Sequence, residues 1–330
     1  MDNVTHTLVG LMLSRAGFDS GPGRGEKGVP VMLMLAANAP DMDTYSFFTD
    51  SLTYLQVHRG YAHALPFAPL VALVPLLLVK AFTRTRFTWA TLAAYVGCLI
   101  AVLSHLLLDW TNVYGVRLML PFSAKWYRLD STDIIDPVIL GALVLAVAAP
   151  ALSGLVTSEM GGRKSRGPRR GWAWFALLAI LLYDTGRWMA HDRAVSIVDA
   201  YNYRGAPAER VSVFPVRFTI MRWRAVVEGN GFIYEAPVDL SRDFDAAGGH
   251  TEYPAISSPA IDAARTTRTF QVFEKFDQLP FWTLLPVEDT LRVELLDLRF
   301  GSIQRPGFEA VAFVEPDHRI AQAYFSFGVR

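Results

Sequence analysis

The chain has 330 residues, of which 52% are hydrophobic and 19% are charged, a composition too apolar for an ordinary soluble enzyme and not apolar enough for a protein that lies in a membrane throughout. Its formal net charge of zero, with basic residues gathered in short loops, argues against nucleic acid as a partner. A single cysteine, Cys98, excludes a disulfide framework and a cysteine-based zinc site.

Two apolar segments, residues 4–16 and 29–39, open the chain and are joined by a Gly-rich connection at residues 19–28. Each segment is shorter than the ~20 residues that a helix needs to cross a bilayer. They predict a short helical hairpin packed against longer helices. Residues 1–18 lack a basic leader, so we expect this segment to remain in the mature protein.

Four longer apolar runs follow, each about as long as a membrane-spanning helix. These runs are residues 65–82, 87–110, 134–156 and 171–189. Lysine and arginine in short loops favour the cytoplasmic side, and they gather at residues 80–86 and 161–170. The opposite ends of the four runs are therefore expected on the extracytoplasmic side.

Beyond residue 190 the sequence changes to short runs rich in β-branched and aromatic residues, which are typical of strands. The expected strands are residues 211–221, 232–236, 269–273, 290–300, 308–314 and 321–327. The predicted fold is an α-helical integral membrane bundle with four long spans and the N-terminal hairpin, residues 1–190. A β-rich soluble domain, residues 191–330, follows on the extracytoplasmic side.

Histidine and aspartate recur at the ends of the apolar segments that are expected to face outwards. Asp2 and His6 are four residues apart, as are His105 and Asp109, so each pair shares one face of a helix. One such pair alone is more often a cap or a surface hydrogen bond. Charge-capable side chains at membrane depth persist mainly where they coordinate, pair or conduct, so several converging pairs favour a common site.

Further carboxylates are expected on the same side of the membrane. Pro40 interrupts the second arm of the hairpin, so a non-helical turn lets both Asp41 and Asp43 face one centre. Asp133 and Asp136 open the third long run. Those two residues either support the site or only cap the helix that follows them.

The motif His58-Arg59-Gly60-Tyr-Ala-His63 supplies two more imidazoles. Gly60 permits a tight backbone. Arg59 offers a planar fork that suits phosphate or carboxylate, although an arginine here can also serve as an interfacial anchor.

Imidazole and carboxylate together suit a divalent ion, with zinc first and manganese or iron as further candidates. Such an ion can generate hydroxide near neutral pH and stabilise charge on a phosphoryl or acyl oxygen. Hydrolysis is therefore the reaction that this set of residues supports best.

The ordered motifs are Met-Asp-Asn-Val-Thr-His from residue 1, Asn-Ala-Pro-Asp-Met-Asp from residue 38, His-Arg-Gly-Tyr-Ala-His from residue 58 and His-Leu-Leu-Leu-Asp from residue 105. Together they resemble the membrane-bound metal-dependent hydrolase family that includes the YdjM-like inner-membrane proteins. The resemblance covers roughly residues 1–190 and implies an inner-membrane protein with a divalent-metal site and hydrolase activity. The motif residues to which it points are Asp2, His6, Asp41, Asp43, His58, His63, His105 and Asp109.

The leading hypothesis is a metal-dependent hydrolase whose site opens to the outer face of the cytoplasmic membrane and takes a lipid, lipid-linked or phosphate-containing substrate. The expected metal ligands are His6, Asp41, Asp43, His58, His63, His105 and Asp109. Asp109 is also a candidate general base, and Arg59 is expected to hold an anionic group. Supporting positions around the ligands are Asp2, Asn38, Asp133 and Asp136.

Two alternatives belong to other classes of protein. In the first, the cluster is a structural metal site or a hydrogen-bonded network in a non-catalytic protein, and the β-rich domain binds a partner. In the second, the acidic and histidine residues form a transport relay. The relay ranks below the other two because the candidate ligands gather at one membrane face instead of crossing the bilayer.

Overall fold

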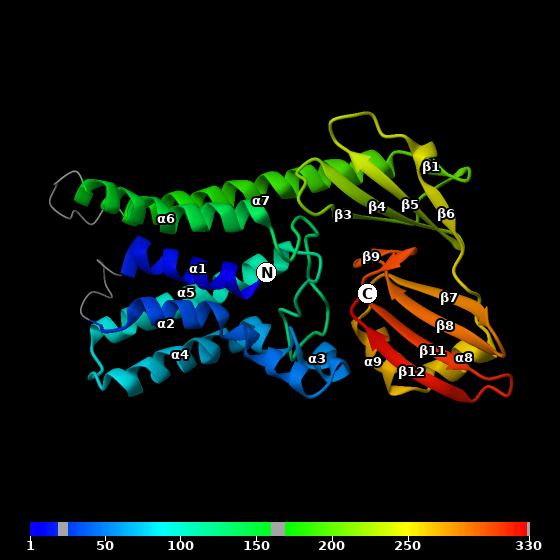
Figure 1. The fold of residues 1–330 in the computed structure, drawn as a ribbon, viewed down its shortest axis with the longest axis horizontal. Helices are drawn as coiled ribbons and strands as arrows, with labels where there is room; N and C mark the ends of the chain where they lie inside the picture. Colours follow the sequence, from blue (N-terminus) through cyan, green and yellow to red (C-terminus); the bar gives the residue numbers. More distant parts are fainter. Residues whose placement is uncertain (19–25, 160–168, 329–330) are drawn as a thin grey trace. The chain divides into compact units, whose positions relative to one another are not determined.

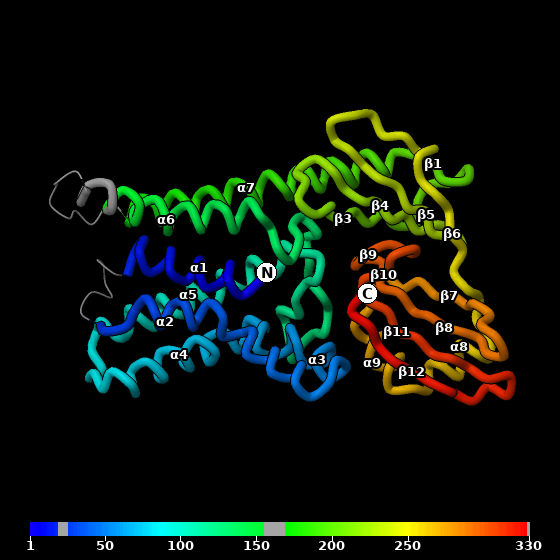
Figure 2. Tube along the Cα trace, in the orientation of Figure 1, coloured from blue at the N-terminus to red at the C-terminus, as the bar shows by residue number. Residues whose placement is uncertain are grey.

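The computed structural model describes residues 1–18, 26–159 and 169–328, without the side chains of residues 155–159. The chain forms two compact units. The first contains residues 1–43 and 59–189, and the second contains residues 44–58 and 190–330. Figure 2 follows the chain through both units.

The first unit is a bundle of α-helices (Figure 1). Its helices are α1 (Asn3–Leu13), α2 (Val29–Asn38), α4 (Ala68–Thr83), α5 (Trp89–Thr111), α6 (Pro137–Glu159) and the first part of α7 (Arg169–Asp199). Helix α1 packs against α2, α5 and α6, and α2 packs against α4 and α5. The two short helices of the expected hairpin are thus central to the bundle. Residues 19–25 of their connection lie outside the described part of the chain.

Within the described residues, three helices are long and apolar enough to cross a membrane: Leu65–Thr83, Trp89–Thr111 and Pro137–Gly154. They correspond to the first three expected spans. The fourth, residues 171–189, belongs to α7 and is not among them, because Asp184 and Arg187 interrupt its apolar run. The structure therefore corrects the number of apolar spans from four to three. Most of the expected basic loop, residues 160–168, lies outside the described residues.

Helix α5 presents two different faces. Leu92, Val96, Ile100, Leu103 and Leu107 are exposed at a spacing of three or four residues, as expected for a stripe in contact with lipid. The opposite stripe is buried and contains Ala94, Cys98, Ala101, His105 and Asp109. The helical period therefore places the histidine and the aspartate inside the bundle.

The second unit contains two four-stranded antiparallel sheets (Figure 1). The first sheet has the order β3 (Arg210–Pro215), β4 (Arg222–Gly229), β5 (Phe232–Asp239) and β6 (His250–Glu252), and the second has the order β12 (Ile320–Ser326), β11 (Glu309–Val314), β8 (Thr290–Asp297) and β7 (Pro280–Val287). Two short hairpins complete the strands: β1 (Asn202–Tyr203) with β2 (Ala206–Pro207), and β9 (Gly301–Ser302) with β10 (Arg305–Pro306).

Ala194 and Val198 at the end of α7 share a core with Trp223 of the first sheet. Helix α3 (Ser51–Val57) packs on α9 (Arg268–Phe276), and α8 (Pro259–Arg265) packs on β8 and β11.

One predicted strand is a helix. Residues 269–273 lie in α9, where Thr267 caps the helix by accepting a hydrogen bond from the N–H of Phe270. Phe270, Phe273 and Phe276 are all buried. Their spacing of three residues fits one side of a helix, so packing outweighs the strand propensity of the aromatic residues.

Candidate metal centre

Three separate segments bring four candidate ligands together. Asp41 comes from the 3-10 helix Pro40–Phe48, His63 from the short turn Tyr61–His63, and His105 and Asp109 from α5. One ligand atom from each lies within 4.8 Å of the others, and all four residues are buried. Asp41 thus meets His105 and Asp109 inside the first unit, although they follow it in the sequence by 64 and 68 positions.

The turn after α2 directs two carboxylates at one imidazole. Helix α2 ends at Asn38, just before Pro40. Asp41 Oδ1 lies 3.2 Å from His63 Nε2, and Asp43 Oδ2 lies 3.3 Å from His63 Nδ1. Both ring nitrogens of His63 therefore face carboxylate oxygens.

The protonation of His105 follows from its neighbours. Its Nδ1 lies 2.7 Å from the carbonyl oxygen of Ala37. A carbonyl can only accept a hydrogen bond, so Nδ1 carries a proton and Nε2 is the nitrogen that can offer a lone pair. This lone pair faces Asp109 Oδ2 at 3.3 Å and His63 Nε2 at 3.2 Å.

A lone pair that faces a carboxylate and a second imidazole needs a proton or a cation between them. A histidine that donates one N–H to a carbonyl and presents its other nitrogen to a cluster of acceptors has the arrangement found at metal-ligating histidines. The Oδ2 atom of Asp109 also makes no hydrogen bond with the described residues. The residues present therefore fit a divalent cation.

Asp109 is surrounded by positive groups. Its Oδ1 lies 3.0 Å from Arg59 Nη2 and contacts the amino group of Met1. All three groups are buried. A metal would bind this carboxylate in its ionised form.

The guanidinium of Arg59 is oriented by the protein. Its Nη1 donates to the carbonyl oxygen of Gly115 at 3.0 Å, and the group lies over the Tyr114 ring at 4.7 Å. The backbone N–H of Arg59 donates to Asp43 Oδ2 at 3.1 Å. The residue expected to hold an anionic group thus faces the internal carboxylate of Asp109.

His6 lies beside the four ligands. Its ring stacks on that of His105 with the centroids 3.7 Å apart. Its Nε2 lies 3.5 Å from Asp109 Oδ1, and neither ring nitrogen makes a hydrogen bond with the described residues. His6 is therefore positioned as a further nitrogen donor.

The expected supporting residues are used elsewhere in the first unit. Asp2 caps α1 through the N–H groups of Val4 and Thr5. Asn38 joins α2 to α1 by donating to Thr7 Oγ1. These two side chains are thus engaged in holding the N-terminal helices.

The two aspartates before α6 also act locally. Asp136 accepts from the N–H of Val138 and from the Tyr183 hydroxyl, and Asp133 accepts from the N–H of Ile134. The capping interpretation therefore describes Asp136 best. His58 is buried at the end of α3, stacked on Tyr54, and belongs to the second unit.

Two participants were not anticipated from the sequence. The amino group of Met1 contacts Asp109, and the side chain of Asn112 accepts from the N–H of Tyr114 at 2.9 Å. Asn112 follows Asp109 by three residues, which also places two side chains on one helical face, so this spacing could have indicated it. No residue pattern indicates the position of a backbone amino group.

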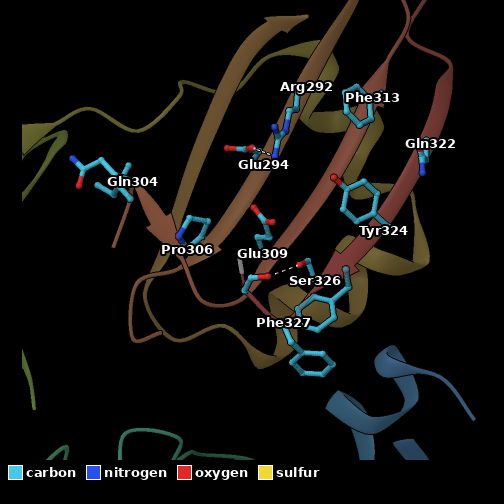
Figure 3. A pocket seen from close by; sticks show the side chains of 13 residues that line it. Arg292, Glu294, Gln304, Pro306, Glu309, Phe313, Gln322, Tyr324, Ser326 and Phe327 are labelled. Carbon is cyan, nitrogen blue, oxygen red and sulfur yellow. Dashed lines mark hydrogen bonds and ion pairs between the residues drawn. The ribbon is translucent and has the colours of Figure 1, made fainter. Parts of the chain in front are cut away.

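A separate groove of about 1030 Å³ lies on the second sheet of the second unit. Figure 3 shows Arg292 and Glu294 of β8, Glu309 of β11 and Tyr324 of β12 along it. Arg292 Nη2 lies 2.6 Å from Glu294 Oε1. None of the candidate metal ligands lines this groove.

A comparison with known proteins finds a family match for the helical part of the chain. The model of a family described as YdjM inner membrane protein matches residues 1–194. A protein named "Uncharacterized protein YfhP", from Bacillus subtilis (strain 168), is 24% identical over 343 residues, which cover 98% of this chain and 94% of that protein. That similarity extends through the β-rich part. No solved structure matches significantly.

Proposed function

The chain belongs to the YdjM inner membrane protein family, and on that premise we propose that it is a membrane-embedded metal-dependent hydrolase. The observation that carries the proposal is the buried group of Asp41, His63, His105 and Asp109, with ligand atoms within 4.8 Å of one another. Ionisable side chains inside a membrane bundle are costly unless they pair or bind an ion. Two carboxylates and two imidazoles converging on one point favour an ion.

Zinc suits this donor set best, and manganese or iron are the alternatives. Asp41, His63, His105 and Asp109 would hold the ion, with His6 as an additional donor. When bound, the ion would supply Lewis acidity that activates water and stabilises negative charge on a phosphoryl or acyl oxygen.

The chain's own residues would prepare this site. Asp43 orients His63 through its Nδ1, and Ala37 orients His105 through its Nδ1. Arg59 would act through Asp109, whose carboxylate it orients, rather than by direct contact with an anionic substrate. Asp109 itself would serve as a ligand or as the general base.

The substrate would be a lipid, a lipid-linked molecule or another phosphate-containing molecule, because such molecules reach this depth by lateral diffusion in the bilayer. We place the site at the outer face of the cytoplasmic membrane, from the basic residues of the loop at residues 80–86. With α7 as a further crossing, despite its polar residues, the β-rich domain would lie outside the cytoplasm as well.

Metal analysis of the purified full chain tests the proposal. We expect one or two divalent ions per chain in the wild type, and at least a tenfold loss of metal in His63→Ala and in His105→Ala. His318→Ala, an exposed position in the second unit, serves as the matched control. Unchanged metal content in both site variants would contradict the proposal that His63 and His105 bind the metal.

A hydrolysis assay separates the enzyme from the non-catalytic alternative. The wild type, loaded with zinc or manganese, is offered phospholipids, lipid pyrophosphates and soluble phosphoesters in liposomes. Turnover that disappears in His63→Ala supports the hydrolase. Bound metal with no turnover of any of these substrates would favour a structural metal site.

The groove of the second unit supports that second candidate. It is open and mostly polar, with Arg292, Glu294 and Tyr324 on its surface (Figure 3), which suits a partner-binding domain. If the domain only recruits a partner, Tyr324→Ala with Arg292→Ala should abolish capture of that partner and leave metal content unchanged.

A further inference from the structure

The turn between β3 and β4 exposes a group of large apolar side chains. Phe218 is 77% exposed, Ile220 52%, Met221 45% and Val216 38%. Single exposed apolar residues are normal on a protein surface, but several in one short turn mark a contact site. The second unit therefore presents an apolar tip, defined as residues 216–222.

The backbone holds this tip in a fixed shape. The N–H of Val216 donates to the carbonyl oxygen of Arg222 at 3.2 Å, and the N–H of Thr219 donates to that of Val216 at 3.2 Å. The Thr219 hydroxyl also donates to the Val216 carbonyl at 2.8 Å. Phe218 has a φ of 60°, a conformation that is rare for a bulky residue. The most exposed apolar residue of the tip thus has an unfavourable backbone conformation.

Charge points to the kind of surface that the tip contacts. The tip carries Arg217 and Arg222 and no acidic residue. Arg222 Nε lies 3.7 Å from Asp239 Oδ2, and its side chain is exposed. Basic residues beside exposed aromatic and aliphatic side chains are typical of segments that enter the headgroup region of an anionic bilayer.

The position of the tip within its own unit agrees with this partner. His191, the second residue of this unit on α7, lies with Nε2 3.1 Å from the carbonyl oxygen of Val213, and its ring packs against Trp223. Val213 and Trp223 lie next to the tip, at the end of β3 and the start of β4. The tip is therefore at the end of the sheet that lies next to the first residues of α7 in this unit.

We propose that residues 216–222 insert into the headgroup region of the bilayer, with Phe218 and Ile220 at the level of the upper acyl chains and the arginines at lipid phosphates. A bilayer is always within reach, because the same chain contains three helices able to cross one. The domain is thus held at the membrane surface by a second contact besides its covalent link to α7.

Lipid quenching of a fluorophore tests this contact in the full chain. In a Cys98→Ala background, Phe218→Cys or Asn230→Cys is labelled with a polarity-sensitive fluorophore and reconstituted in liposomes that contain phosphatidylglycerol and spin-labelled lipids in both leaflets. Asn230 lies in the exposed turn at the opposite end of the same sheet and is the matched control. We expect at least threefold stronger quenching at position 218 than at position 230.

Charge variants and dilution complete the test. Arg217→Glu with Arg222→Glu should at least halve the quenching at position 218 in phosphatidylglycerol while metal content stays unchanged. Equal quenching at both positions, no quenching at position 218, or no effect of the charge variants would overturn the proposal. A fluorescence change at position 218 that disappears when the protein is diluted in the bilayer would instead assign the tip to a second copy of the chain.

Discussion

Arg59 and Asp109 form the charged pair on which the buried cluster depends. Arg59 Nη2 lies 3.0 Å from Asp109 Oδ1, and both side chains are almost fully buried. Removing one member of a buried pair leaves an uncompensated charge, at a cost of about 3–5 kcal/mol. We therefore expect Arg59→Met to lower the free energy of unfolding of the metal-free protein by about that amount, as measured by denaturant unfolding in detergent.

A double variant distinguishes this cause from a simple packing defect. Arg59→Met combined with Asp109→Asn removes both charges, so it should be less destabilised than the sum of the two single variants. Strictly additive losses would show that the two side chains do not interact as a pair. Metal should also reduce the loss in Arg59→Met, because a bound cation would balance Asp109.

Asp277 provides a pH-dependent test in the second unit. Burial and the nearby negative charge of Asp297 hold the pKa of Asp277 well above its usual range. An aspartate with a raised pKa in the folded state stabilises the fold below its unfolded pKa of about 3.9, and this stability is lost as the pH rises through the folded pKa. Asp277→Asn keeps the oxygen that accepts from the N–H of Leu279 and removes the charge.

The expected result for Asp277→Asn is a gain that grows with pH. Near pH 3 the variant and the wild type should unfold alike, and near pH 8 the variant should be more stable by about 1–3 kcal/mol, the usual cost of one unsatisfied buried group. Unfolding curves of the second unit between pH 3 and pH 8 measure this. Asp289→Asn, at an exposed turn, is the control. A gain independent of pH would contradict the explanation.

Spacing in the sequence indicated some site residues and misjudged others. His105 and Asp109 share a helical face, as their separation of four residues predicts, and their ligand atoms lie 3.3 Å apart. Asp2 and His6 have the same separation, yet Asp2 caps α1. A carboxylate at a helix start can satisfy the first N–H groups locally, and sequence spacing alone does not distinguish that use from a place in a shared cluster.

At the level of elements, the close approach of α1 and α2 determines where His6 lies. A Cβ atom added at Gly10 would lie 2.5 Å from the carbonyl oxygen of Leu33, closer than any real contact allows. Gly10→Ala should therefore separate the two helices and cost about 1–3 kcal/mol. Because α1 also carries His6, metal affinity should fall as well.

Thermal unfolding and metal titration of Gly10→Ala check this prediction. Gly141→Ala on α6 is the matched control, since no heavy atom lies within 4 Å of its added Cβ. Alanine is the better helix former, so the control should be unchanged or gain up to about 1 kcal/mol. A loss of similar size in both variants would point to a general effect of glycine replacement.

The sequence pattern predicted the helices that are long continuous apolar runs. It missed a strand whose prolines conflict with the usual strand pattern. The spans at α4, α5 and α6 are continuous apolar runs. Strand β7 contains Pro280 and Pro286, which weaken a strand assignment from sequence, yet it is an edge strand, where proline is tolerated. Proline is tolerated in β7 because this strand lies at the edge of the sheet, and a sequence pattern does not show which strand lies at an edge.

For the whole molecule, the division into two units does not follow the chain order. Residues 44–58 belong to the second unit, although they lie between Asp43 and Arg59 of the first. Within the second unit, Arg268 of α9 donates to Thr53 of α3 at 2.9 Å, and Phe327 packs near Tyr54. Composition predicts one boundary near residue 190 and does not show that residues 44–58 belong to the second unit.

The side of the membrane on which the second unit lies depends on α7. Its 31 residues would extend over ~46 Å, more than the ~30 Å of a hydrocarbon core. Its polar residues bond to the segment just before α6: Tyr183 donates to Asp136 at 2.9 Å, and Arg187 donates to the carbonyl oxygen of Ser131 at 2.9 Å. The polar part of α7 thus lies beside the loop before α6.

Reporter fusions test the resulting topology. Alkaline phosphatase, which is active only outside the cytoplasm, should be active when fused after Ser123 or after Tyr201 and inactive when fused after Arg86. Ser123 lies in the loop between α5 and α6, and Arg86 in the basic turn between α4 and α5. An inactive fusion after Tyr201 together with an active one after Ser123 would mean that α7 does not cross, because the two positions differ only by α6 and α7. The β-rich domain would then face the cytoplasm, and a metal site open to the outer face would function without it.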